Sequence, residues 1–151
     1  MNKLPLLAVA CVGFAVSAGI ALAGTAGESY KVSSTLNAKS EVPAPKGAPA
    51  GAGGSFSGTY VENSKGAVLT WKLTFSKLSG AATAAHIHMA KTGVAGPVVV
   101  PLCGPCHSPM SGKATISKAV VAAIEGGKAY VNVHTTKNAA GEIRGQAKVA
   151  E

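Results

Sequence analysis

Strict alternation of apolar and polar side chains over residues 69–75, within the extended segment 67–75, is the feature that most constrains this fold. The apolar members are Leu69, Trp71, Leu73 and Phe75, and the polar residues Thr70, Lys72 and Thr74 stand between them. A repeat of two residues puts the two sets on opposite faces of a β-strand, which predicts a strand that is buried on one side only. Turn residues at 63–66 precede this strand and predict a hairpin with the extended segment 55–61.

Further short extended segments, separated by residues typical of turns, lie at 29–36, 83–89, 97–102, 113–116, 130–134 and 142–149. One short helix is expected, because Ser117 is a favourable N-cap residue and Gly126-Gly127 would end the helix. The segment 43–54 is rich in glycine, alanine and proline, and we interpret it as a surface connection. The sequence therefore predicts an all-β Greek-key sandwich or barrel of about eight short strands with one short helix.

The first 23 residues have the features of a secretory signal peptide. Lys3 supplies a positive charge, residues 4–22 are uncharged and apolar or small, and Ala21-Leu22-Ala23 matches the pattern that precedes a cleavage site. The apolar run is close to the length that spans a bilayer, but no basic stop-transfer cluster follows it. We therefore expect residues 1–23 to be removed, with no stable membrane span after processing. Residues 24–151 would then form one domain, periplasmic or secreted.

The basic character of the chain does not indicate a nucleic-acid partner. The net charge is +8 and no aspartate is present, but the lysines are scattered singly rather than grouped in a basic run. Few aromatic residues accompany them, whereas a nucleic-acid groove combines clustered cations with stacking side chains. We expect instead a solvated basic surface with a weak attraction for anionic polymers.

Three segments together resemble the CHRD domain, a module named after chordin that also occurs alone in exported bacterial proteins. They are A-H-I-H at 85–88 followed by G-P-V-V at 96–99, Y-V-N-V-H-T at 130–135, and G-E-I-R-G-Q at 141–146. The resemblance covers nearly the whole of residues 24–151, although Met89-Ala90-Lys91 stands where many members place a glycine. It implies an extracellular β-sandwich module that has no settled enzymatic role in bacteria.

Three histidines have the pattern of a metal site. Side chains alternate along a strand, so His86 and His88 share one face, and His134 lies on the face opposite Val131 and Val133. With the aliphatic residues in the core, the three imidazoles point away from it and can converge on one ion with an open position. We expect a copper ion, which imidazole sites favour among divalent ions, with zinc as the alternative. Because only neutral imidazole binds, affinity should fall as the pH drops through about 6.5.

The H-x-H strand is also similar to the one that supplies two copper ligands in copper/zinc superoxide dismutases, which are Greek-key sandwiches as well. This resemblance implies that His86, His88 and His134 are copper ligands, and that Arg144 lies near the site as the anion-guiding arginine of those enzymes does. It extends to the copper half alone, because the chain has no aspartate and no histidine suited to bridging a second metal. Dismutase activity is therefore not expected.

Two cysteines, Cys103 and Cys106, lie outside the expected signal peptide, and such a pair in an exported protein favours a disulfide. With His107 they also match C-x-x-C-H, the pattern of c-type haem attachment. The surrounding prolines and Gly104 describe a turn with no helix after it, and large apolar side chains for a haem pocket are few. We therefore expect a disulfide and no haem. His107 is expected to be an exposed loop residue, with a fourth metal ligand as the alternative.

No set of residues in the sequence is typical of catalysis. The chain lacks the aspartate of a Ser-His-Asp triad, and its glutamates have no partner that indicates acid–base chemistry. We assign no catalytic residue and favour a function other than catalysis. The first hypothesis is a copper-binding sandwich for storage, delivery or simple redox chemistry. The second is a metal-free adhesion or scaffold module, and a c-type haem protein is the third.

Intact-mass spectrometry of the protein recovered from the cell envelope or medium tests the processing and the cysteine chemistry together. We expect the mass of residues 24–151 less two hydrogens, because the signal is cleaved after Ala23 and the two thiols are oxidised. An intact Met1 terminus in the cytosol would contradict export. The added mass of a haem, with a Soret absorbance band, would contradict the disulfide.

Overall fold

The computed structural model describes residues 27–150, and the expected signal peptide, residues 1–23, lies outside them. The elements are β1 (Ser29–Asn37), the 3-10 helix η1 (Ala38–Ser40), β2 (Gly53–Asn63), β3 (Gly66–Ser76), β4 (Ala82–Met89), β5 (Val98–Cys103), β6 (Met110–Ser117), α1 (Lys118–Glu125), β7 (Ala129–Thr135), β8 (Ile143–Gln146) and β9 (Lys148–Val149). The prediction of an all-β sandwich or barrel with one short helix is confirmed.

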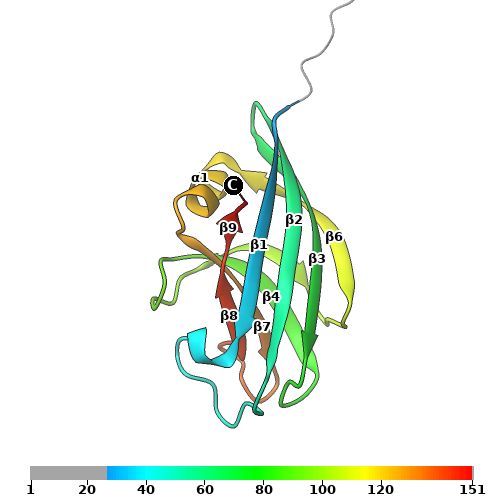
Figure 1. The fold of residues 1–151 in the computed structure, drawn as a ribbon, viewed down its shortest axis with the longest axis vertical. Helices are drawn as coiled ribbons and strands as arrows, with labels where there is room; N and C mark the ends of the chain where they lie inside the picture. Colours follow the sequence, from blue (N-terminus) through cyan, green and yellow to red (C-terminus); the bar gives the residue numbers. More distant parts are fainter. Residues whose placement is uncertain (1–26, 151) are drawn as a thin grey trace, which may run out of the picture.

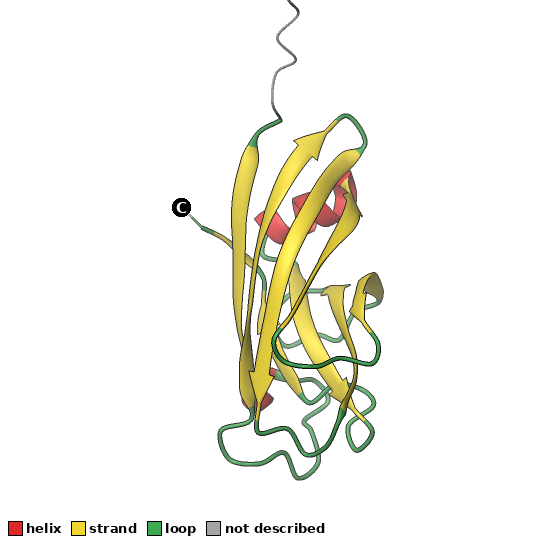
Figure 2. Ribbon diagram, turned by 90° about the vertical axis from the view of Figure 1, so that its right-hand side faces the viewer, coloured by secondary structure: helices red, strands yellow, loops and turns green. Residues whose placement is uncertain are grey.

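All the strands belong to one antiparallel sheet, with the order β5-β4-β7-β8-β1-β2-β3-β6 and with β9 beside β1. The sheet curls until its two halves face each other as a barrel-like sandwich (Figures 1 and 2). The helix α1 packs against β3, β6, β7 and β9 at one end of the interior. Within residues 27–150, no helix has the length and apolar character needed to cross a membrane.

The alternation that predicts a half-buried strand is present in β3. Leu69, Trp71 and Leu73 are buried in the interior, and Thr70 and Lys72 between them are exposed. The two-residue turn 64–65 joins β2 to β3 as the expected hairpin. Burial of these large side chains against the opposite half of the sheet is what holds the sandwich closed, since the hydrophobic effect grows with the apolar area removed from water.

The helix begins and ends as its sequence predicts. The Ser117 hydroxyl accepts a hydrogen bond from the Val120 amide at 3.3 Å and so satisfies one of the free amides of the first turn. Val120 and Ile124 are among its buried residues, and Gly127, with φ of +65°, follows its last turn in the left-handed region that favours glycine.

Two sequence interpretations need correction. The segment 142–149 is two strands rather than one, because the Ala147 amide leaves the ladder to bond the Ala129 carbonyl at 2.9 Å. The segment 43–54 is more than a surface connection, since Ala52 is buried, and its last two residues begin β2. The Lys46 amide also donates to the Asn138 side chain at 2.7 Å, which ties this segment to the loop between β7 and β8.

A glycine on β6 sets how closely Trp71 can pack. Gly112 faces Trp71 across the ladder, and a Cβ there would lie 2.6 Å from the indole ring. Gly112→Ala should therefore lower the free energy of unfolding by about 1–3 kcal/mol through overpacking. Thermal melts followed by circular dichroism measure this. Gly80→Ala is the matched control, because nothing lies within 4 Å of the added Cβ; equal melting temperatures for the two variants would contradict the prediction.

Candidate metal centre

The three predicted histidines come together on neighbouring strands. β4 carries His86 and His88, and β7, which pairs with β4, carries His134. His134 lies opposite Ala84, so it is the diagonal neighbour of His86 on the same face of the ladder. The other face of this ladder carries Ile87 and Val131, which are buried in the core. Strand alternation therefore places the histidines as the sequence predicts.

β5, an edge strand of the sheet, pairs irregularly with the histidine strand. The register between β4 and β5 shifts between Ala85 and His86 and again between Ile87 and His88. Pro101 stands opposite His86, and proline is tolerated at an edge because its missing N–H is not needed by a further strand. Such irregularities bend a strand and redirect its side chains, so this part of the sheet departs from a flat surface.

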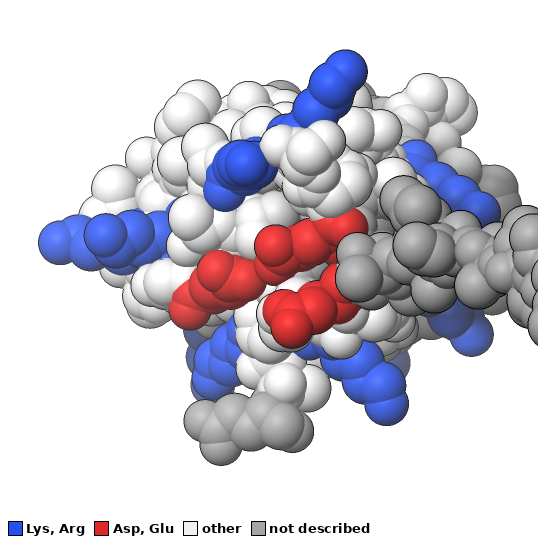
Figure 3. Space-filling view, turned by 90° about the horizontal axis from the view of Figure 1, so that it is seen from above, with Lys and Arg blue, Asp and Glu red and all other residues white. Residues whose placement is uncertain are grey.

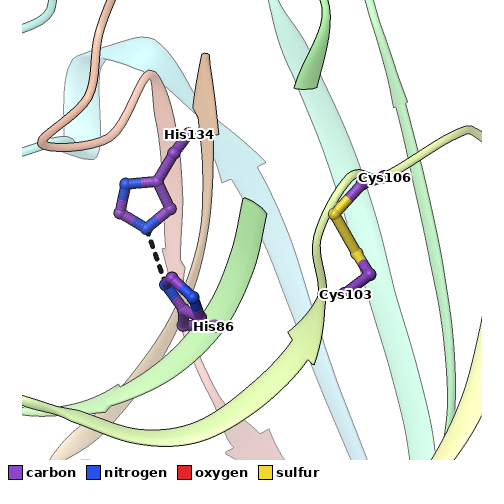
Figure 4. Close-up of a disulfide and its surroundings, with 4 residues drawn as sticks. All are labelled: His86, Cys103, Cys106 and His134. Atoms are coloured by element: carbon purple, nitrogen blue, oxygen red, sulfur yellow. Dashed lines mark hydrogen bonds between the residues drawn. A yellow bond between two sulfur atoms is a disulfide. The ribbon is translucent and has the colours of Figure 1, made fainter. Parts of the chain in front are cut away.

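The imidazoles converge closely enough to share one ion. One nitrogen from each histidine can be chosen so that all three lie within 4.8 Å of one another. His86 Nδ1 and His134 Nε2 are hydrogen-bonded at 3.0 Å, and Figure 4 shows this bond as the dashed line between the two tilted rings. The ring centroid of His88 lies 5.6 Å from that of His86 and 5.8 Å from that of His134. Three imidazole ligands leave at least one coordination position open on a tetrahedral ion.

These histidines are largely shielded from solvent. His88 is 7% exposed and His134 8%, while His86 is half-buried. They face away from the hydrophobic core, but the loops that follow β4 and β7 contact His88 and His134 from the outside. The site is therefore an enclosed polar layer over the sheet, with His86 as its most accessible ligand.

Backbone carbonyls fix which ring nitrogen carries the hydrogen in His88 and in His134. His88 Nδ1 lies 2.8 Å from the Gly96 carbonyl, and His134 Nδ1 lies 2.9 Å from the Ala139 carbonyl. A carbonyl only accepts, so both Nδ1 atoms carry hydrogen. His134 Nε2 then accepts a hydrogen bond from His86 Nδ1 at 3.0 Å, whereas the lone pair of His88 Nε2 is free. His88 Nε2 is buried without a hydrogen-bond partner. A buried unpaired acceptor is costly, and a metal ion would satisfy it.

A buried glutamate organises the loop that holds His134. Glu142 accepts hydrogen bonds from the Ser79 amide at 2.6 Å, from Thr135 Oγ1 at 2.6 Å and from Asn138 Nδ2 at 3.1 Å. Burial raises the pKa of Glu142, but these bonds outweigh burial and hold its pKa below the usual range. The ionised carboxylate thus fixes the 136–142 turn, which includes the Ala139 carbonyl.

The expected accessory residue Arg144 lies near the site but is not exposed to solvent. Its guanidinium carbon stands 3.4 Å over the Tyr130 ring, and that ring stacks on His88 with centroids 4.8 Å apart. β4 and β8 flank β7, so Tyr130 separates the imidazole from the cation. Arg144 is 1% exposed and donates to the Lys91 carbonyl at 3.1 Å. The comparison with an anion-guiding arginine therefore fails in one respect, since no solvent-facing guanidinium is available.

Two further buried polar residues complete the layer, and the sequence analysis assigned them no role. Asn132, 1% exposed, lies between the histidines and Glu41, which is 4% exposed. A Cβ at Gly141 would lie 2.3 Å from the Glu41 carboxylate, so only glycine fits beside it. Alternation along β7 puts Asn132 on the histidine face. No pattern in the sequence predicts that Glu41 lies here, because Glu41 follows η1 at the end of β1 and is distant from β7 in the chain.

Burial keeps the three imidazoles neutral. Desolvation, followed by repulsion from His134 and His88, lowers the pKa of His86 to about 4. Desolvation likewise lowers the pKa values of His88 and His134. The hydrogen bonds to the Gly96 and Ala139 carbonyls raise these pKa values, but desolvation outweighs them. Protons should therefore compete with a metal ion for the imidazoles at a more acidic pH than the value of about 6.5 that the sequence alone suggests.

The cysteine loop is separate from the histidines. The sulfur atoms of Cys103 and Cys106 are 2.09 Å apart, at disulfide-bonding distance (Figure 4). The Cys106 amide donates to the Ala82 carbonyl at 3.1 Å, which fastens this loop to the start of β4. His107 is exposed and is not in the histidine group.

Comparison with known proteins identifies the family. The family model of the CHRD domain matches residues 32–147, which span β1 to β8 and include all three clustered histidines. The chain therefore belongs to the CHRD domain family, as its motifs predict. The search of curated proteins found no match, and the search of solved structures found none either.

The lowered histidine pKa values give a direct test in the metal-free protein. His86 should titrate near pH 4 rather than near 6.5, because protonation would place a charge in a desolvated site beside two other imidazoles. Imidazole chemical shifts in NMR spectra recorded from pH 8 to below pH 4 measure this. A midpoint for His86 near pH 6.5 would contradict the prediction.

Proposed function

We propose that this CHRD-domain protein is exported and binds one copper ion through His86, His88 and His134. Two observations carry the proposal: the buried Nε2 of His88 has no hydrogen-bond partner, and one nitrogen from each of the three histidines lies within 4.8 Å of the other two. Carbonyl acceptors behind His88 and His134 are the outer-shell partners that metal-binding histidines use to fix their tautomer.

The charge of the layer favours copper over zinc. The histidine group contains no carboxylate. Burial causes the largest lowering of the pKa of His88, and repulsion from the Arg144 guanidinium behind Tyr130 lowers it further. The same repulsion acts on a bound cation and grows with its charge. Zinc is always divalent, whereas copper also binds as Cu(I), and imidazole suits both metals. Glu41, on the far side of Asn132, also lies in this layer, and burial raises the pKa of its carboxyl group, which opposes its ionisation. A neutral ligand set beside a fixed cation therefore favours the monovalent ion.

The proposed role is storage, delivery or simple redox chemistry of copper outside the cytoplasm. His86 is the most accessible of the three ligands, so exchange of the ion would begin on its side. Export is supported by the sequence of residues 1–23 and by the cysteine pair at bonding distance, since disulfides persist in oxidising compartments.

Metal titration with two matched histidine variants tests the proposal. The purified protein should bind one equivalent of copper, with Cu(I) affinity measured by competition with bicinchoninate and Cu(II) and Zn(II) affinity by calorimetry. His88→Ala should weaken copper binding by at least about 100-fold, because one ligand of three is lost. His107→Ala, an exposed histidine outside the group, should leave it unchanged.

Circular dichroism of His88→Ala controls for loss of the fold. Equal copper affinity in wild type and His88→Ala, or no binding by the folded wild type, would contradict the proposal. Either result would favour the second hypothesis, a metal-free adhesion or scaffold module. Tighter binding of zinc than of either copper ion would contradict the argument from charge while leaving the histidine site intact.

A further inference from the structure

The outer surface of the β1-β2-β3-β6 half of the sheet is exposed, whereas loops cover the histidine side. Two neighbouring rows of side chains cross it, and the strand register defines both. The first row runs Lys31, Thr59, Thr70, Lys113. The second runs Lys148, Ser33, Ser57, Lys72, Ser111. All of these residues are exposed. We call this surface the hydroxyl–lysine face.

The hydroxyl–lysine face is hollowed rather than flat. A groove of about 540 Å³ lies over its centre, and its lining includes Ser57, Thr59, Thr70, Lys31 and Lys72 together with the apolar residues Val32, Gly58, Trp71 and Ala150. The hydroxyl side chains are short and the lysines are long, so the cations stand around a lower floor of hydroxyl and apolar groups. The two lysines of each row are three strand spacings apart, about 14 Å between their Cα atoms. An extended ligand can therefore contact more than one cation at once.

The carboxylates of the surface lie elsewhere. Glu28 accepts a hydrogen bond from Tyr30, Glu125 accepts one from Tyr60 at 3.0 Å, and the two tyrosine rings stack with centroids 5.2 Å apart. Figure 3 shows acidic side chains gathered at this end of the molecule. Neither row of the hydroxyl–lysine face contains an acidic residue, so within residues 27–150 its lysines have no carboxylate partner on the face.

We propose that the hydroxyl–lysine face binds an acidic polysaccharide in its groove. The cations complement carboxylate or sulfate groups spaced along a polymer, and the serine and threonine hydroxyls can both donate to and accept from sugar hydroxyls. Neither row contains an aromatic side chain, and Trp71, which lines the groove, is buried, so this face offers no exposed ring on which nucleic-acid bases could stack. This site is separate from the histidines and does not depend on copper binding.

Binding to polygalacturonate, with neutral dextran as the comparison, tests the proposal. The protein should bind polygalacturonate in a salt-dependent manner and should not bind dextran. The double variant Lys31→Gln/Lys72→Gln should weaken binding about tenfold, since each exposed ion pair contributes a modest free energy. Lys65→Gln/Lys128→Gln is the matched control, because it removes the same charge from exposed positions outside both rows and should bind as wild type does.

A second pair of changes tests the hydroxyl groups without altering charge. Thr59→Val/Thr70→Val keeps the branched shape of both side chains and should weaken polygalacturonate binding about tenfold through two lost hydrogen bonds. Equal loss in the two lysine double variants would show attraction by net charge alone and would overturn the proposal. Absence of polygalacturonate binding would overturn it as well. So would tighter binding of phosphatidylglycerol vesicles or oligothymidylate through the same lysines.

Discussion

The pairing of β4 with β7 is the interaction on which the rest of the structure depends. It joins segments more than forty residues apart in the chain and places Ile87 beside Val131, in the buried core, on one face of the ladder. The same hydrogen bonds bring His86 and His134 together on the other face. Because a shift of one residue would exchange the two faces, burial of the aliphatic residues fixes the register that assembles the histidines.

The outside of this ladder is unusual because it is polar and yet buried. Loops after β4 and β7 bond His88 and His134, and η1 is followed by Glu41, which reaches the same layer. Burying polar groups costs free energy unless each has a partner, and carbonyls and the Glu142 network satisfy part of the layer. Four atoms of the layer lack a partner within residues 27–150, namely Glu41 Oε2, Asn132 Oδ1, Arg144 Nη1 and His88 Nε2. The last of these lies where a metal ion would supply the missing interaction.

The two halves of the sandwich therefore present different chemistry to the outside. The β4–β7–β8 side is covered by loops and encloses neutral imidazoles beside a buried cation. The β1–β2–β3–β6 side has no such cover and exposes short hydroxyl side chains between lysines. One hydrophobic interior supports both, since strand alternation leaves the outward positions of each half free of any role in the core.

The sequence by itself determined the all-β class, the β2–β3 hairpin, the capped helix and the outward direction of the three histidines, because all of these follow from local periodicity and capping. Tertiary structure alone decided what covers the histidines. Arg144 and Glu41 reach this layer from separate strands and loops, so their burial, the stacking on Tyr130 and the lowered histidine pKa values depend on long-range packing. The division of residues 142–149 into two strands was decided in the same way, by the bond from Ala147 to Ala129. Periodicity records which side of a strand a residue occupies, but it carries no information about which distant segment packs over that side.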